Sequence, residues 1–186
     1  MSTGEALNVD LSDFTTQLYS LILSLGLAPE VDAVPTTSSS SRASASPSLR
    51  TAISAKTATA MAATSTTSDL LFRALHLAFA PRTAVPPWRA AAFAKRLLSA
   101  ALHWPGAIAL RALEFVTRLV AREPRLEALL STEDRTVDGV YRPDVEDPQL
   151  SNPFATSAYE LHLLQTAHID AQVREAAASL ANYVRI

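Results

Sequence analysis

Two neighbouring stretches with helical apolar spacing constrain the fold of this chain more than any other feature. From Trp88 to Leu102, and again from about Ala107 to Ala121, apolar residues recur at the spacing of one helix face. The Trp104-Pro105-Gly106 link is short enough to force the two helices to pack antiparallel. The sequence therefore predicts a helical hairpin. Its inward positions are Ala90, Ala94, Leu97, Leu98 and Ala101 in the first helix, and Ile108, Ala112, Phe115, Val116 and Leu119 in the second.

Two more helices are expected before this hairpin. Asp10 or Ser12 can cap a helix that stops at Gly26, and Ser68 or Asp69 can cap another that ends before Pro81. The first helix is too apolar on one side to stay in water, so it is expected to pack against the later hairpins. The apolar stripes are Phe14, Leu18, Leu21, Ile22 and Leu25 in the first helix, and Leu71, Leu75, Ala78 and Phe79 in the second.

A second hairpin is expected at the end of the chain. Pro124 starts a short helical segment that runs through Leu130. Ser157 to Glu160 has the spacing of a capping box and would open a helix to about Ala167. Asp170 can then cap a last helix, whose inward positions are Val173, Ala177, Leu180 and Val184.

The composition favours an all-α fold. Only 4 of the 186 residues are glycine, while alanine and leucine abound, so tight β-hairpin turns are few and helix formers dominate. Successive helix pairs at a spacing near the ~40 to 47 residues of HEAT and armadillo repeats predict an α-solenoid. We expect residues 1–30 to supply an N-terminal helix and 68–186 a helical domain. Residues 31–67, rich in Ser, Thr, Ala and Pro, read as a flexible, disordered insertion.

The sequence lacks cysteine and the motifs of the common catalytic sites. The chain has no cysteine, which excludes disulfides, thiol nucleophiles and thiolate metal ligands. It has no G-x-S-x-G elbow, phosphate-binding glycine loop or H-E-x-x-H helix. His162 and His168 are expected on different helix faces, so a shared metal is not expected. We therefore expect no enzyme activity, metal, cofactor or small-molecule substrate, and the absence of a long apolar run predicts a soluble, intracellular chain.

Charge is divided between two adjacent parts of the chain. Residues 82–126 hold eight Lys or Arg against two acidic residues, and residues 127–160 hold eight Asp or Glu against two Arg. Exposed cations of the basic part could contact RNA phosphates, although solvated helix faces are the commoner reason for such charges. The candidate RNA contacts are Arg89, Lys95, Arg96, Arg111, Arg118 and Arg122.

The acidic part includes an irregular stretch from Ser131 to Pro153 that is a candidate docking loop. Asp138-Gly139, Arg142-Pro143 and Asp147-Pro148 each interrupt regular structure. A loop of this length is usually functional. We expect Tyr141, Leu150 and Phe154 to pin it to the helical body by burial, and Asp144, Glu146 and Asp147 to face a partner. A cation site is the weaker interpretation, because no calcium-loop spacing is present.

Three stretches resemble the CBF-domain (CCAAT-binding factor) family of nucleolar-complex, or Noc, proteins. Residues 131–161 resemble the end of that domain, where a G-V-[FY]-x-P segment and an acidic loop lead to a [WY]-E-L helix, here Tyr159-Glu-Leu161. Residues 87–98 are similar to an A-F-x-K-R-L helix of the family. Ala6 to Leu11, with Gln17 to Tyr19, looks like an earlier family helix.

The resemblance implies a role that the residue patterns alone do not supply. Family members are longer, so this chain would correspond to a C-terminal portion. The implied function is a non-catalytic scaffold in the nucleus and nucleolus, acting in ribosomal RNA processing and in maturation and export of large-subunit (pre-60S) particles. The implied partners are the second Noc protein and those particles. The alternative is a nucleic-acid-binding module that acts on pre-rRNA or in DNA replication initiation.

Overall fold

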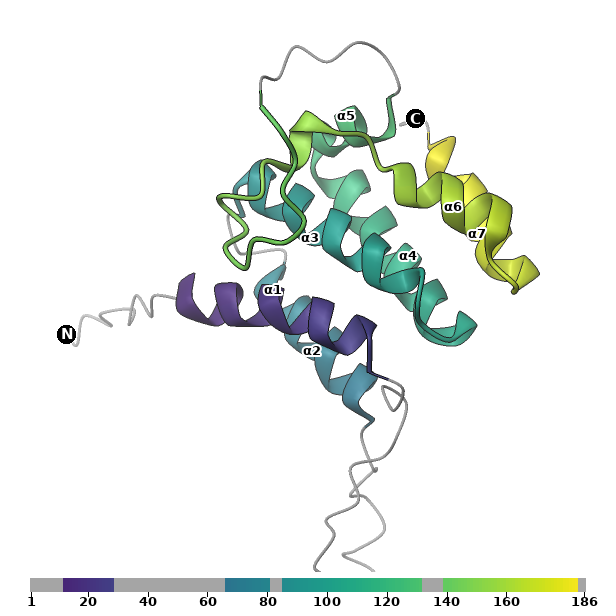
Figure 1. The fold of residues 1–186 in the computed structure, drawn as a ribbon, viewed down its shortest axis with the longest axis horizontal. Helices are drawn as coiled ribbons and strands as arrows, with labels where there is room; N and C mark the ends of the chain where they lie inside the picture. Colours follow the sequence, from purple (N-terminus) through teal and green to yellow (C-terminus); the bar gives the residue numbers. More distant parts are fainter. Residues whose placement is uncertain (1–11, 29–65, 81–84, 132–138, 184–186) are drawn as a thin grey trace, which may run out of the picture.

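The computed structural model describes residues 12–28, 66–80, 85–131 and 139–183, and every regular element in these ranges is a helix (Figure 1). The all-α prediction is confirmed. None of these helices is both long enough and apolar enough to cross a membrane. The elements in chain order are α1 (Ser12–Gly26), α2 (Thr67–Ala78), α3 (Pro87–Ala101), α4 (Gly106–Arg122), the 3₁₀ turn η1 (Pro124–Leu126), α5 (Glu127–Leu130), the 3₁₀ turn η2 (Pro153–Ala155), α6 (Tyr159–Ala167) and α7 (Ala171–Ala181).

Helix α3 is the central element. It begins at Pro87, as the Pro86-Pro87 pair predicts, and contacts α1, α4 and α6. Every residue from Ala90 to Ala101 is buried except the half-buried Ser99. Burial therefore extends beyond the predicted inward positions to the other sides of this helix. Because α3 has neighbours on all sides, even Lys95 and Arg96 lie inside the molecule.

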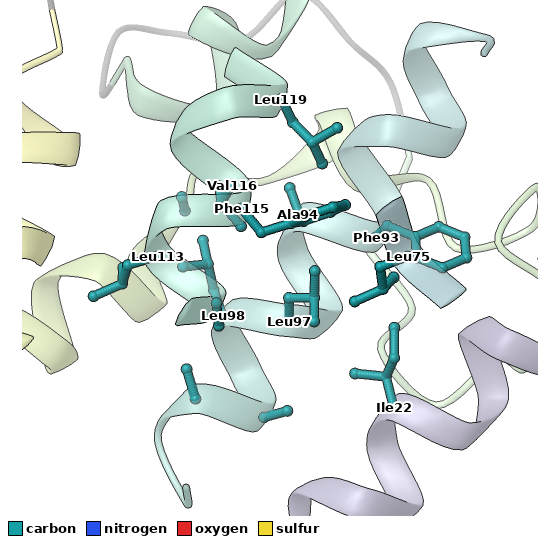
Figure 2. Packing of buried hydrophobic residues seen from close by; sticks show 14 of the residues in the cluster. Ile22, Leu75, Phe93, Ala94, Leu97, Leu98, Leu113, Phe115, Val116 and Leu119 are labelled. Atoms are coloured by element: carbon teal, nitrogen blue, oxygen red, sulfur yellow. The ribbon is translucent and has the colours of Figure 1, made fainter. Parts of the chain in front are cut away.

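Aromatic and branched side chains from four helices meet around α3 (Figure 2). The ring of Phe93 lies 5.0 Å from that of Phe79 and 5.2 Å from that of Tyr19. Phe79 also packs edge-on against Phe115 of α4, with ring centroids 5.8 Å apart. The inward positions predicted for α3 and α4 are all buried, and the hairpin is confirmed.

Helix α1 packs against α3, as its apolar stripe predicts. Leu18 and Ile22 are buried and Leu25 packs partly buried against the core, but Phe14 and Leu21 are 44% and 51% exposed, so two of the five predicted positions face outward. The helix ends at Gly26, where a Cβ would lie 3.1 Å from the Cβ of Ala100. Asp10 and most of the predicted insertion lie outside the described residues.

The starts of α2, α6 and α7 differ in how well the sequence predicted them. The cap of α2 is Thr66 rather than Ser68 or Asp69, and Asp69 completes a capping box with it. Asp170 does cap α7, accepting the N–H of Gln172 at 2.8 Å. The capping box predicted at residues 157–160 is wrong, because Ala158 precedes α6 without a side-chain cap.

Helices α6 and α7 form the second predicted hairpin, and α7 also contacts α4. Val173, Ala177 and Leu180 face inward as expected, and Val184 lies outside the described residues. Residues 139–158 lead into α6, and the η2 turn within them contacts α3 (Figure 1). This segment carries the candidate docking loop.

Candidate functional site

The residues 139–152 form a loop that closes on itself, which we call the acidic loop. The N–H of Arg142 donates to the carbonyl oxygen of Ser151 at 2.9 Å, joining the two ends. Gly139 has a φ of 108° and Asn152 a φ of 47°, the left-handed region that glycine and asparagine tolerate best. A Cβ on Gly139 would lie 2.6 Å from the Nδ2 of Asn152, so the ends are also in close contact.

Arg96 of α3 fastens the acidic loop to the helical body. Its side chain is buried, and its Nη2 donates to the carbonyl oxygens of Pro143 and Val145 at 2.6 and 2.7 Å. The Nη1 donates to the carbonyl oxygen of Tyr19 in α1 at 3.3 Å, and the guanidinium carbon lies 3.8 Å from the centre of the Tyr19 ring. Hydrogen bonds from a charged donor are stronger than neutral ones, so this one side chain holds two loop carbonyls firmly.

Lys95, the preceding residue, fixes the start of α6. Its Nζ donates to Oε2 of Glu160 at 2.6 Å and to the carbonyl oxygen of Ser157 at 2.7 Å. The Lys95 and Glu160 side chains are both fully buried. The Ser99 hydroxyl donates to the other Glu160 oxygen, Oε1, at 3.0 Å. The pair therefore has the additional hydrogen bonds that a buried ion pair needs.

Two tyrosine rings complete the surroundings of the Lys95 ammonium. Its Nζ lies 3.9 Å from the ring centre of Tyr159 and 4.8 Å from that of Tyr141, within cation–π range. Burial, and then nearby groups that include Glu160, raise the pKa of both tyrosine hydroxyls. Both hydroxyls therefore stay protonated at neutral pH, and Glu160 is the one negatively charged group among these neighbours of the Lys95 ammonium.

The prediction that three large apolar side chains anchor the loop by burial while its carboxylates face outward is partly wrong. Tyr141 and Phe154 are half-buried, and Phe154 packs against the core. Leu150 is 61% exposed and pins nothing. The loop is instead held by Arg96 and by burial of the small residues Pro148, Ser151 and Pro153.

The carboxylates do lie outside. Asp144 and Glu146 are exposed, and Asp144 lies 3.8 Å from Arg142 in a loose surface pair. Asp147 is half-buried and accepts the N–H of Gln149 at 2.8 Å, a local turn contact. Of the three predicted carboxylates, Asp144 and Glu146 are therefore the two that the loop fully exposes.

Burial removes two of the predicted RNA contacts. Lys95 and Arg96 are 0% and 2% exposed, so neither can meet a phosphate on the surface of this structure. Sequence periodicity placed Arg96 on an outward face because the neighbours of α3 come from distant parts of the chain.

The remaining predicted cations lie nearer the surface and have partners of their own. Arg111 pairs with Asp69 of α2 at 2.9 Å, and Arg118 pairs with Glu114 one turn earlier at 3.6 Å, as predicted. Arg122 donates to the carbonyl oxygens of Phe79 and Ala80 at 2.7 and 3.0 Å, which satisfies the end of α2. Arg89 is half-buried beside the Trp88 ring. Two of these contacts join α4 to α2.

His162 and His168, which were predicted not to share a metal, lie in different surroundings. His162 is exposed, whereas the Nδ1 of His168 accepts the N–H of Asp170 at 3.1 Å in the turn before α7. Among the residues that the structure describes, no three His, Asp or Glu side chains are grouped as a metal site would require.

The sequence of this helical body matches the CBF/Mak21 family over residues 1–177. The chain belongs to the CBF/Mak21 family. It is similar to nucleolar complex-associated protein 3 of Schizosaccharomyces pombe, 28% identical over 174 residues, and to the protein of that name in Saccharomyces cerevisiae, 31% identical over 160 residues. These alignments cover 94% and 85% of this chain but only 22% of each relative.

A second branch of the family is also similar. Nucleolar complex protein 4 homolog of Danio rerio is 34% identical over 101 residues, which is 52% of this chain and 19% of the relative. The predicted resemblance to CBF-domain Noc proteins, and to the third of them most of all, is confirmed by these matches. This chain spans about a fifth of the length of its yeast relatives.

Glu160 and Ser157 were not predicted to belong to the site. Both were assigned to a helix cap because their spacing fits one, yet the carboxylate of Glu160 turns inward to Lys95. One signal was available. Alanines at positions 90, 91, 92 and 94 make α3 small on every side, which is typical of a helix surrounded by others.

Proposed function

We propose that this chain is part of a non-catalytic nucleolar scaffold that acts in the assembly of the large ribosomal subunit. The observation that carries the proposal is the family match over residues 1–177 together with the printed names of the yeast relatives, nucleolar complex-associated protein 3. Localisation to the nucleus and nucleolus belongs to the same proposal. Its finer parts are association with pre-60S particles, ribosomal RNA processing and export of the particles.

The acidic loop is the proposed contact surface within this scaffold. Its main chain is fixed by Arg96, and its exposed carboxylates Asp144 and Glu146 extend from that fixed main chain. A preformed loop loses little conformational entropy when it binds. Its charge favours a partner with a basic surface, and the second Noc protein is the proposed partner.

An α-solenoid of the HEAT or armadillo type is the proposed architecture of the longer protein. The contact between α4 and α7 sets the α3/α4 hairpin beside the α6/α7 hairpin, which is how neighbouring repeats of a solenoid pack. Stacked hairpins give a long surface on which several partners can bind at once. This favours a scaffold role.

Purification of the tagged chain from nucleolar extract tests the proposal. We expect the second Noc protein and large-subunit precursor RNA to co-purify with it, and a fluorescent fusion to concentrate in the nucleolus. A tagged chain of similar size from outside the family is the control. Recovery of neither the Noc protein nor precursor RNA above that control, with diffuse fluorescence, would contradict the proposed function.

The second candidate function is direct nucleic-acid binding, on pre-rRNA or in DNA replication initiation. Arg111 and Arg118 favour it, because their side chains are 39% and 54% exposed on the outer side of α4. Phosphate contacts give a steep loss of affinity with salt, whereas apolar protein docking does not. Binding of labelled pre-rRNA to the purified chain at rising salt, with Arg111→Glu and Arg118→Glu as the test variant, separates the two functions.

A further inference from the structure

Arg96 hydrogen-bonds both α1 and the acidic loop. Its guanidinium has carbonyl acceptors on each: Tyr19 in α1, and Pro143 and Val145 in the loop. These partners lie 77, 47 and 49 residues from Arg96 in the sequence. Two segments that are remote from each other in the chain therefore share one buried cation.

Because Arg96 is charged and buried, losing the contacts with either segment would be costly. In the described part of the chain no carboxylate lies within ion-pair distance of Arg96, so carbonyl dipoles and the Tyr19 ring surround the cation instead. A buried charge that loses part of its polar surroundings is strongly destabilised. Withdrawal of α1 would remove a carbonyl and a ring, and the cation would then turn toward solvent and release the loop carbonyls.

The acidic loop has only partial burial to hold it after such a release: Pro148 and Ser151 are buried, and Tyr141 is half-buried. Its side chains Val140 and Leu150 are 78% and 61% exposed. Its own hydrogen bonds, such as that from the Leu150 N–H to the Asp147 carbonyl oxygen, close local turns rather than attach it to the helices. Attachment of the loop therefore depends heavily on Arg96.

We propose that Arg96 is a positioning residue that couples the docking of α1 to the conformation of the acidic loop. Coupling of this kind is reciprocal, so a partner that fixes the loop also stabilises α1 on α3, and displacement of α1 loosens the loop. The inference concerns the chain itself and holds whatever molecule binds the loop.

Amide hydrogen exchange on the folded chain tests the first half of the coupling. The amides of Arg142 and Leu150 report on the loop, because both are hydrogen-bonded within it. Arg96→Met should speed their exchange about tenfold or more, since it removes two charged hydrogen bonds. Arg96→Lys, which keeps the charge but lacks the planar guanidinium and its several donors, should give an intermediate rate. Arg118→Met, which removes an exposed arginine on α4, should leave these rates unchanged.

A change in α1 tests the second half. Tyr19→Leu keeps apolar volume but removes the ring under the guanidinium, and should speed exchange of the same two loop amides severalfold. Tyr19→Phe keeps the ring and should have a clearly smaller effect, although it removes a hydroxyl that faces Ser151 of the loop. In the Arg96→Met background, Tyr19→Leu should add nothing further at the loop.

Two results would overturn the coupling. One is loop exchange that is equal in Tyr19→Leu and Tyr19→Phe. The other is full additivity of Tyr19→Leu and Arg96→Met at the loop amides. If Arg96→Met does not fold, the loop-amide exchange rates of the two Tyr19 variants are compared with those of Arg96→Lys. Exchange of amides inside α4 then serves as the reference for global stability.

Discussion

At the scale of single residues, the buried pair of Lys95 and Glu160 has the largest expected energetic effect. Breaking a fully buried ion pair leaves one charge without a partner, which costs about 3–5 kcal/mol. Glu160→Ala should lower the free energy of unfolding by that amount in urea denaturation. Glu114→Ala, which breaks the exposed pair with Arg118, should cost at most about 0.5 kcal/mol.

The double variant Lys95→Met with Glu160→Leu adds a sharper comparison. It replaces both charges with apolar groups of similar size, so it should be more stable than Glu160→Ala alone. Equal stabilities of Glu160→Ala and the Glu114→Ala control would show that the pair is not buried in solution. The same denaturation curves supply both comparisons.

Phe154 and Leu150 offer a second test at this scale. Phe154 is half-buried against the core, so Phe154→Ala should lower stability by about 2 kcal/mol, less than the ~3–5 kcal/mol of a fully buried phenylalanine. Leu150→Ala removes an exposed side chain and should change stability by at most about 0.5 kcal/mol. A larger loss at Leu150 than at Phe154 in thermal unfolding would restore the sequence-based prediction that Leu150 pins the loop.

At the scale of elements, the sequence predicted where helices form better than it predicted how the helices pack against one another. Apolar spacing and prolines located α3 and α4 because those signals are local. The burial of Lys95 and Arg96 could not be derived this way, since charged residues in a helical pattern are normally outside. The inward turn of Glu160 depends on Lys95, 65 residues earlier in the chain, and no local pattern at 157–160 encodes it.

The capping box of α2 gives a prediction for an element boundary. Thr66→Ala removes the side-chain acceptor of the Asp69 N–H and should cost about 1 kcal/mol, whereas Thr67→Ala one position later should cost less. Hydrogen bonds from Thr66, and then the nearby Arg111, hold the pKa of Asp69 below its usual range. A lowered carboxyl pKa stabilises the fold above the usual pKa and loses that effect as the pH falls through the lowered one.

The stability gap between the wild-type chain and Thr66→Ala should therefore be widest near neutral pH and should narrow in acid. Chemical denaturation at several pH values from neutral to strongly acidic measures it. A gap that stays constant with pH would mean that Thr66 does not act through Asp69.

At the scale of the whole molecule, the fold gives a rigid support for one exposed acidic loop. Helix α3 sits among α1, α4 and α6, and its two cations hold the segment that leads from the loop into α6. On this proposal, the loop carboxylates bind a partner and do not contribute to folding.

The most direct measurement is co-purification of the second Noc protein with a loop variant, Asp144→Ala combined with Glu146→Ala. Both side chains are exposed, so the melting temperature should stay within the error of the wild-type value while recovery of the partner falls. The matched control is Asp13→Ala combined with Glu175→Ala, two exposed acidic residues on α1 and α7, which should retain full recovery. Undiminished recovery by the folded loop variant, or equal losses in both variants, would contradict the proposed docking role of the acidic loop.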